Sequence, residues 1–255
     1  MRSASGEEGA FQEYAADLHI HTVLSPCADL EMSPTAVVHR ARQAGLSLIA
    51  VTDHNAAANA PALRDAAAGA GVGALYGMEV RSEEEVDVLC LFDELGPALA
   101  WQEAVYAALP DVANDPLLFG DQVVVDRDEH IVRFEARLLI NAVRVPLRSV
   151  AQETVRRGGL VIPAHVDRPV NSLISQLSFP PADCPFDAME ISPFGKEEEM
   201  RVRHPWLRDF SLVRFSDAHT LGDVGRQRTW LRAQAPTVRE IRMALRGEEG
   251  RGFHL

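Results

Sequence analysis

The chain has 255 residues, of which 47% are hydrophobic and 24% are charged, and its formal net charge is −12. This composition is typical of a folded globular protein, and no apolar run reaches the roughly 18 to 20 residues that cross a membrane. The acidic balance disfavours binding to a membrane or to duplex nucleic acid, although bound cations can reverse the sign inside a site. The three cysteines are spaced too widely for a disulfide framework or a CxxC zinc site.

A chain of this length can form one large α/β domain or two small ones, and no internal repeat divides it. The first residues, 1–14, contain no apolar signal-peptide core. We therefore expect a short flexible lead-in over 1–14, a single domain over 15–255 and a cytoplasmic protein.

Short apolar runs alternate with helical patterns along the chain. In chain order, the pattern predicts a helix over 33–45, strands over 46–52, 73–80 and 86–92, and a helix over 99–109. Residues 111–142 predict an insertion, with a small strand at VVVD and a candidate helix at EARLLINA. After it come a helix over 146–158, strands over 159–166, 186–192 and 211–219, and a helix over 237–247.

This alternation, with nearly continuous apolar strands, predicts a mostly parallel sheet covered by helices. An open doubly wound sheet and a barrel both satisfy the pattern, and in either fold ligands bind at the edge where the strands end. Five of the nine histidines fall at that edge: His19, His21, His54, His165 and His219. We interpret the other four as surface residues: His39, His130, His204 and His254.

Each of these strand ends offers a metal ligand or a structural polar group. His19 and His21 in DLHIHT share one face of a strand, so they can reach one metal or simply hydrogen-bond at the strand end. Asp53 in VTDHN can orient a ligand or cap the next segment. Glu79 in GMEV is a carboxylate in an apolar strand, which is costly to bury unless it is paired or binds a metal.

Imidazole and carboxylate ligands suit zinc, iron or manganese. The candidates outnumber the four ligands of one tetrahedral zinc, which predicts a site for two or three divalent metals. Such sites activate water as hydroxide and clamp the oxygens of a phosphoryl group. The sequence therefore predicts hydrolysis of a phosphoester by a metal-activated hydroxide.

Five motifs, DLHIHT, TDHN, GMEV, PAHVDRP and SDAHT, follow one another between residue 17 and the C-terminal region. In this order they resemble the PHP family (polymerase and histidinol phosphatase). The resemblance implies a distorted (β/α)7 TIM-like barrel, which periodicity alone does not choose over an open sheet. It also implies the metal ligands His19, His21, His54, Glu79, His165, Asp217 and His219.

Two further ligand positions depart from the family pattern. In SPCADLE, either Asp29 or Cys27 can take the position, and we favour Asp29 because a carboxylate suits a hydrolytic metal, whereas Cys27 can equally be an apolar filler. Asp87 stands where the family tends to place a histidine. It is either a ligand or a solvated carboxylate at the start of a strand.

Three basic side chains are expected to bind the substrate: Arg168, Lys196 and Arg226. Arg168 directly follows a ligand loop and can hold a phosphate bidentately, or it can pair with an acid such as Asp167. The expected catalytic group is His165, Asp217 and His219. A histidine of this group that is not fully used as a ligand can protonate the leaving oxygen.

The expected substrate is a phosphomonoester, a nucleotide or a short oligonucleotide. Two alternatives stay open: a non-catalytic metal-binding PHP module with a regulatory or interaction role, and an exonuclease-like activity on single strands. An amidohydrolase barrel also opens with HxH, but it needs a metal-bridging lysine, and Lys196, the only lysine, has no strand-end context. The sequence does not indicate the oligomeric state.

Overall fold

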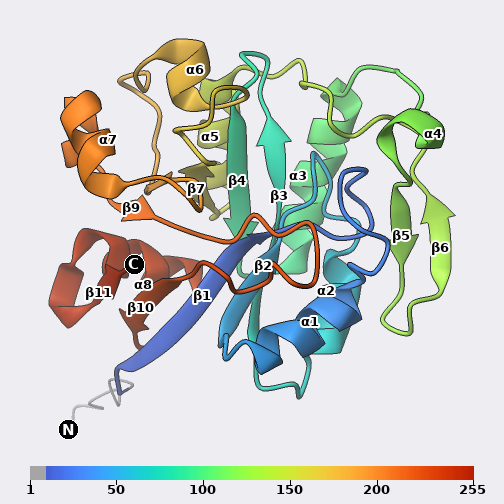
Figure 1. Cartoon of the computed structure of the whole chain (residues 1–255), viewed down its shortest axis with the longest axis horizontal. Coiled ribbons are helices and arrows are strands. Elements are labelled where there is room, and N and C mark those ends of the chain that lie inside the picture. The colour runs from blue at the N-terminus through green and yellow to red at the C-terminus, as the bar shows by residue number, and fades with distance from the viewer. Residues whose placement is uncertain (1–9) are drawn as a thin grey trace, which may run out of the picture.

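The computed structural model describes residues 10–255. Its largest element is a seven-stranded mixed sheet with the order β11-β10-β1-β2-β3-β4-β7 (Figure 1). The strands are β1 (Gln12–Ile20), β2 (Leu48–Val51), β3 (Gly73–Arg81), β4 (Asp87–Phe92), β7 (Leu160–Pro163), β10 (Thr229–Ala233) and β11 (Gly252–His254). β1, β2 and β3 run parallel, whereas β4 is antiparallel to β3 and β7, and β10 is antiparallel to β1 and β11. The expected parallel pairing is therefore limited to part of the sheet.

Two short strands close this sheet into a distorted barrel. β8 (Met189–Glu190) and β9 (Leu212–Val213) pair in parallel. The Val166 amide donates to the Glu190 carbonyl at 2.8 Å and joins β8 to the segment after β7. The His21 amide donates to the Ala218 carbonyl at 2.9 Å and joins the segment after β9 to the end of β1. The ring runs β1-β2-β3-β4-β7-β8-β9 and returns to β1, so the expected α/β, TIM-like fold is confirmed.

The inside of this ring is apolar. Because side chains alternate between the two faces of a strand, every second residue of the strands points into the same space. The buried cluster there includes Leu18, Leu48, Leu75, Leu89, Ile162 and Phe215. Ile241 and Leu245 of α8 (Val238–Arg246) pack against the same cluster.

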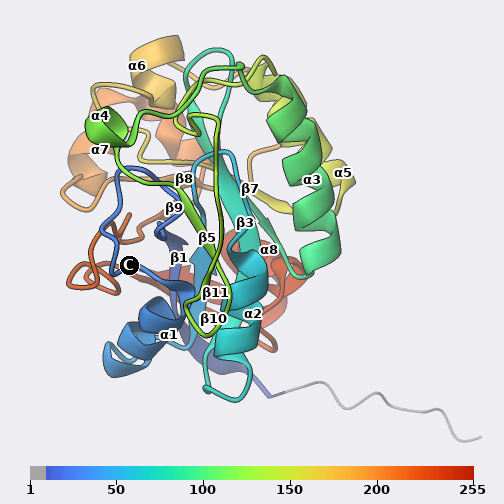
Figure 2. The same cartoon turned by 90° about the vertical axis from the view of Figure 1, so that its right-hand side faces the viewer.

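Helices surround the ring. They are α1 (Pro34–Gln43), α2 (Ala60–Ala67), α3 (Leu95–Ala108), α5 (Leu147–Arg156), α6 (Leu173–Leu177) and α7 (Glu197–Arg203), with 3-10 turns at Pro205–Asp209 and Glu248–Gly250. α1 starts at the expected cap, because the Ala36 amide donates to Ser33 Oγ at 3.0 Å. α3 and α5 lie side by side on one face (Figure 2), and the Arg157 guanidinium covers the Trp101 ring at 5.4 Å. α2 lies in an alanine-rich part of the sequence, residues 56–70, where no helix was predicted.

Residues 111–142 form the expected insertion, which stands at one side of the molecule (Figure 1). It contains α4 (Pro116–Phe119) and the hairpin of β5 (Val123–Val125) and β6 (Ile131–Phe134). The helix expected at EARLLINA is wrong, because this segment is irregular. Gln122 Nε2 donates to the Arg137 carbonyl at 2.7 Å, and Asn55 Nδ2 donates to the Leu139 carbonyl at 2.6 Å. These side chains donate hydrogen bonds to backbone carbonyls that, in a helix, would accept from the helix's own amides.

The N-terminal strand begins earlier than expected. β1 starts at Gln12, so the last residues of the expected lead-in over 1–14 are strand. Residues 1–9 lie outside the described part of the chain. Among residues 10–255, every helix is too short or too polar to cross a membrane.

Candidate metal centre

One edge of the ring collects the polar side chains that were expected at strand ends, together with Glu190, which was not expected there. Three of the residues lie within strands there: His19 in β1, Glu79 in β3 and Glu190 in β8. Four lie in the segments that follow β2, β7 and β9: His54, His165, Asp217 and His219. Because β4 is antiparallel to β3, its first residue, Asp87, lies at the same edge, opposite Arg81.

Glu79 lies at the middle of this cluster. Its Oε1 is 3.3 Å from His19 Nε2 and 3.2 Å from His165 Nε2. Its Oε2 is 3.0 Å from His54 Nδ1. Asp217 is a second centre, since its Oδ1 lies 3.2 Å from His19 Nε2 and 3.3 Å from His21 Nε2. Each carboxylate therefore faces at least two imidazoles, as a carboxylate shared between metals does.

The donor atoms form three sets in which all atoms lie within 4.8 Å of one another. The sets are His19, His21 and Asp217; His19, Glu79 and His165; and His21, Cys27, His54 and His219. Nδ1 of His165 is buried without a hydrogen-bond partner, although such atoms are usually paired. Nδ1 of His54 is also buried, and although Glu79 Oε2 is 3.0 Å away the pair does not have hydrogen-bond geometry. This set of nitrogen, oxygen and sulfur donors fits divalent metals such as zinc.

Buried carboxylates outside the three sets hold the imidazoles in place. Asp53 accepts hydrogen bonds from the Thr22 amide and from Ser25 Oγ, both at 2.7 Å. Ser25 Oγ in turn lies 2.9 Å from His21 Nδ1. Asp53 thus orients a candidate ligand through Ser25, one of the two roles expected for it. Asp17 accepts from the amides of Ser216 at 3.0 Å and Gly225 at 2.9 Å, which ties β1 to the loop after β9.

Glu190 contacts this cluster, although it was not predicted from the sequence. Its Oε2 lies 2.9 Å from His19 Nδ1 and accepts from the His165 amide at 3.0 Å. It therefore orients two candidate ligands from outside the cluster. The signal was present, because a single glutamate in the apolar run FDAMEIS repeats the pattern of GMEV.

The charges in the cluster shift one another's pKa values. Burial lowers the pKa of His19, but Glu190, Asp217 and Glu79 outweigh it and raise the pKa well above the usual range. Burial acts on His54 in the same way, and Glu79 raises its pKa to about 10. Burial and the neighbouring charge of His219 lower the pKa of His21 well below the usual range. The cluster is thus an ionised group of carboxylates balanced by imidazolium charge.

Cys27 and Asp29 differ in their distance from the cluster. Asp29 is exposed, and its side chain belongs to none of the three sets. Cys27 is also on the exposed loop, but its Sγ lies 3.4 Å from His54 Nε2. Burial raises the pKa of this thiol, yet hydrogen bonds to His219 and His54 bring it down to about 6. The geometry therefore favours Cys27, where the sequence favoured Asp29.

Asp87 reaches the site but is held by an arginine. Arg81 Nε donates to Asp87 Oδ1 at 2.8 Å and Arg81 Nη2 donates to Oδ2 at 2.9 Å. The nearest candidate ligand, His165 Nε2, is 3.9 Å from Asp87 Oδ2. A bidentate guanidinium occupies both carboxylate oxygens, so Asp87 is in none of the three sets.

The three expected substrate-binding residues lie at different distances from the centre. Arg168 pairs with Asp217 rather than Asp167, and it lines both a cavity of about 130 Å³ at the cluster and an adjoining pocket of about 900 Å³. Arg226 lines the larger pocket and pairs with Asp223 at 2.5 Å. Lys196 is exposed, pairs with Glu199 and lines neither. Arg81, which was not expected, lines the smaller cavity.

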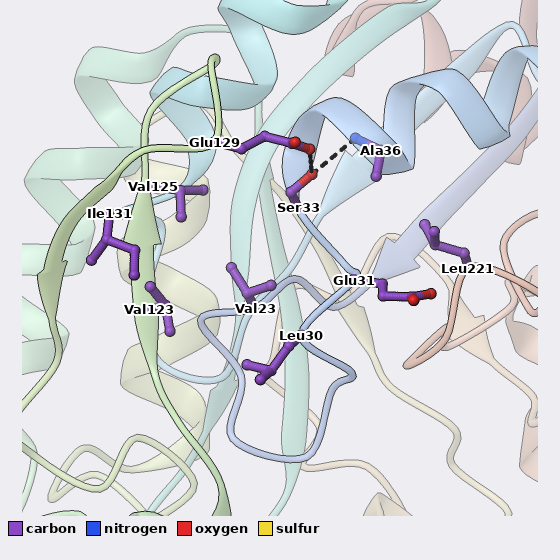
Figure 3. A pocket seen from close by; sticks show the side chains of 10 residues that line it. All are labelled: Val23, Leu30, Glu31, Ser33, Ala36, Val123, Val125, Glu129, Ile131 and Leu221. Carbon is purple, nitrogen blue, oxygen red and sulfur yellow. Dashed lines mark hydrogen bonds between the residues drawn. The ribbon is translucent and has the colours of Figure 1, made fainter.

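A separate pocket of about 540 Å³ lies between the β5–β6 hairpin, the loop after β1 and α1 (Figure 3). Its lining is mostly aliphatic, for example Val23, Val123 and Ile131. Ser33 Oγ donates to Glu129, which ties the hairpin to the start of α1. None of the candidate metal ligands lines this pocket, so we place the functional site at the strand ends.

The PHP domain model matches residues 17–239 of the chain. The chain therefore belongs to the PHP domain family, the family expected from the five motifs. A curated relative, the uncharacterized protein YqxK of Bacillus subtilis (strain 168), is 34% identical over 101 residues, which cover 37% of this chain and 25% of YqxK.

Solved structures share the fold at low sequence identity. The lesion-specific endonuclease PfuEndoQ from Pyrococcus furiosus matches 96% of this chain with a TM-score of 0.70 and 19% identity. A complex of endonuclease Q with a 27-mer duplex that has an abasic lesion at the active site matches 94%, with a TM-score of 0.68 and 19% identity. The chain spans 58% of each of these two chains. A protein described as a metal-dependent phosphoesterase, from Bifidobacterium adolescentis, matches 82% of this chain and 89% of its own length, with a TM-score of 0.56 and 19% identity.

Proposed function

We propose that this PHP-family hydrolase is a metal-dependent phosphoesterase that uses two or three divalent metals, with zinc, manganese and iron as the candidates. The observation that carries the proposal is the convergence of the three donor sets on one small cavity. Arg81 and Arg168 line that same cavity, so positive charge is available for an anionic group beside the ligands. Imidazoles, carboxylates and guanidinium groups around a common space are the recurrent parts of phosphoryl-transfer sites.

Bound metals would polarise the phosphoryl oxygens and lower the pKa of a water molecule so that it becomes a nucleophile near neutral pH. The chain's own residues prepare the site for this chemistry. Glu79 offers both oxygens to three imidazoles. Glu190 contacts the ring of His19, and Asp53 holds Ser25, which contacts the ring of His21. Rigid ligands of this kind keep their donor atoms in place when substrate binds.

Arg168 is the residue best placed to bind the phosphate. Its side chain is 40% exposed, pairs with Asp217 and lines the small cavity. A guanidinium in this position can exchange part of its contact with the carboxylate for a phosphate oxygen. Arg81 already donates two hydrogen bonds to Asp87. Its role is therefore to supply positive charge and not to bind the phosphate bidentately.

A histidine at the opening is the candidate proton donor to the leaving oxygen. His219 is half-buried, and its Nδ1 lies 2.8 Å from the Asp217 carbonyl. His165 is buried and faces Glu79. His219 is therefore better placed than His165 to meet a leaving group, provided that its Nε2 is not a metal ligand.

The larger pocket indicates room for a substrate beyond the phosphate. It opens next to the metal centre through Arg168 and Asp217 and is lined further out by Arg226, Gln227 and the exposed ring of Phe194. Such a mixture of cationic, amide and aromatic groups suits a nucleotide or a short oligonucleotide. The likeness to endonuclease Q supports adding a lesion-containing duplex to the substrates tested, which the acidic net charge alone disfavours.

The test is hydrolysis by the purified chain with its metal content measured. The panel comprises a phosphomonoester, a phosphodiester, nucleotides, a short single strand and a duplex with an abasic site. We expect the His19→Ala, His21→Ala double variant to lose metal and turnover together, while His39→Ala, on α1 and outside all three donor sets, keeps both. Unchanged turnover in the double variant would refute the proposal. Stoichiometric metal without hydrolysis of any substrate would instead support the non-catalytic module.

A further inference from the structure

The aliphatic pocket beside the β5–β6 hairpin lies apart from the metal centre and has the size of a small-molecule site. Its volume is about 540 Å³, within the roughly 300 to 1,000 Å³ of pockets that bind small ligands. Three segments that lie far apart in the sequence form it: residues 23–36, the hairpin, and the loop after β9 (Figure 3). Leu30 and Ile131 of its lining are 65% and 59% exposed, so apolar surface is available to a ligand.

Hydrogen bonds hold the walls of this pocket together. The Val123 amide donates to the Val23 carbonyl at 2.8 Å, which joins the hairpin to the loop after β1. Thr35 Oγ1 donates to the Arg127 carbonyl at 2.6 Å and ties the hairpin turn to α1. Asn59 Nδ2 donates to the Val123 carbonyl at 3.1 Å. Because the walls are already fixed, a ligand loses little binding free energy to ordering them.

The pocket is negatively charged. Among residues 10–255, its lining includes two glutamates, Glu31 and Glu129, and no arginine, lysine or histidine. The arginine closest to each of them in sequence has another partner. Arg127 pairs with Asp128 at 3.8 Å, and Arg40 Nε donates to a backbone carbonyl at 3.1 Å. The net charge of −12 adds to the negative potential, so charge complementarity favours a cationic ligand.

We propose that this pocket binds a small organic cation with an apolar body and one ammonium or guanidinium group, which pairs with Glu129. The carboxylate of Glu129 and the side chain of Leu30 lie at opposite ends of the lining, with aliphatic side chains between them (Figure 3). A molecule that is charged at one end and apolar along the rest matches this arrangement. An anion or a zwitterion would bring a negative group to a lining that offers it no basic side chain.

Titration followed by methyl NMR tests the proposal without relying on metal or on hydrolysis. The cationic probe is cyclohexylmethylamine, and its matched controls are the neutral cyclohexylmethanol and the anionic cyclohexanecarboxylate. In the native chain, we expect the amine to shift the methyl signals of Val23, Val123 and Ile131. It should bind at least about threefold more tightly than the alcohol, the effect of a partly exposed ion pair. The carboxylate should bind more weakly than either.

Three variants assign the binding to this pocket. Glu129→Gln removes the charge but keeps an oxygen that can accept from Ser33 Oγ, so we expect it to lose most of the preference for the amine. Glu103→Gln, at an exposed position of α3 outside the pocket, should keep that preference. Ala36→Leu places a larger side chain in the cavity and should weaken the binding of both the amine and the alcohol.

Three outcomes would overturn the proposal. The first is a set of shifts that the amine produces outside the lining but not within it. The second is a preference for the amine that Glu129→Gln retains in full. The third is a dimer, detected by sedimentation at the concentration used for NMR, whose interface covers the lining, since a second copy of the chain would then be the occupant.

Discussion

His19 is fully buried, and both of its ring nitrogens are engaged. Its Nδ1 faces Glu190, and its Nε2 faces Glu79 and Asp217. The strand-end pattern predicted that His19 and four other histidines would meet at one edge, because parallel strands bring their ends together. The full set of seven expected ligands came from the resemblance to the PHP family. Neither source predicted that Arg81 binds Asp87, because this contact depends on how β3 and β4 pair. Nor did they predict that Asp29 faces solvent, because Asp29 lies in an irregular loop.

Glu190→Gln tests the support of His19. Glutamine keeps the size of the side chain but removes the negative charge behind the imidazole. We expect metal affinity to fall by about 10- to 100-fold, as for other residues that orient a ligand. Competition with a chromogenic chelator measures this, and Glu199→Gln on exposed α7 should bind metal like the native chain. Equal affinity in the two variants would contradict the assigned role.

Metal binding should release protons near neutral pH. In protein stripped of metal by a chelator, neighbouring carboxylates hold the pKa of His19 well above the usual range and that of His54 at about 10. A metal must displace these protons, so its apparent affinity should rise with pH and level off above the pKa of about 10. Calorimetry in two buffers with different ionisation enthalpies measures the release. A binding heat that is independent of the buffer would count against protonated ligands.

At the scale of the elements, the turn from β3 to β4 brings Asp87 to the site. Only a few residues separate these strands, so they can pair only as an antiparallel hairpin. The short connection is visible in the sequence and indicates an antiparallel pair, but the prediction of a mostly parallel sheet did not take it into account. EARLLINA was misread for a different reason: the side chains of Gln122 and Asn55, which lie outside this segment, bind its backbone carbonyls and hold it in an irregular form.

Gly77→Ala tests the close packing of this hairpin. A Cβ at Gly77 would lie 2.0 Å from the Cys90 carbonyl oxygen of the paired strand, so β3 and β4 would have to separate. We expect a loss of about 3 kcal/mol in the free energy of unfolding, measured by urea denaturation. Gly96→Ala in α3 is the matched control, because a Cβ there has nothing within 4 Å and should change stability by less than about 0.5 kcal/mol. Similar stabilities for the two variants would argue against the tight pairing.

At the scale of the whole molecule, the ring is closed by β8 and β9, two strands of two residues each. Periodicity identifies them as apolar runs but does not show that they complete a circle. The order of the five motifs chose the barrel, because the PHP family has this fold. The candidate metal centre depends on this closure, because it places His19 of β1 beside Asp217, which follows β9.

The central claim is that the metal centre hydrolyses phosphoesters. Its most direct test measures turnover of a chromogenic phosphodiester by the native chain before chelation, after removal of metal, and during titration with zinc or manganese while bound metal is counted. We predict that turnover disappears with the metal and returns in proportion to the metal that is bound again. Turnover that survives complete removal of metal, or its absence from the fully loaded protein on every phosphoester, would contradict the claim.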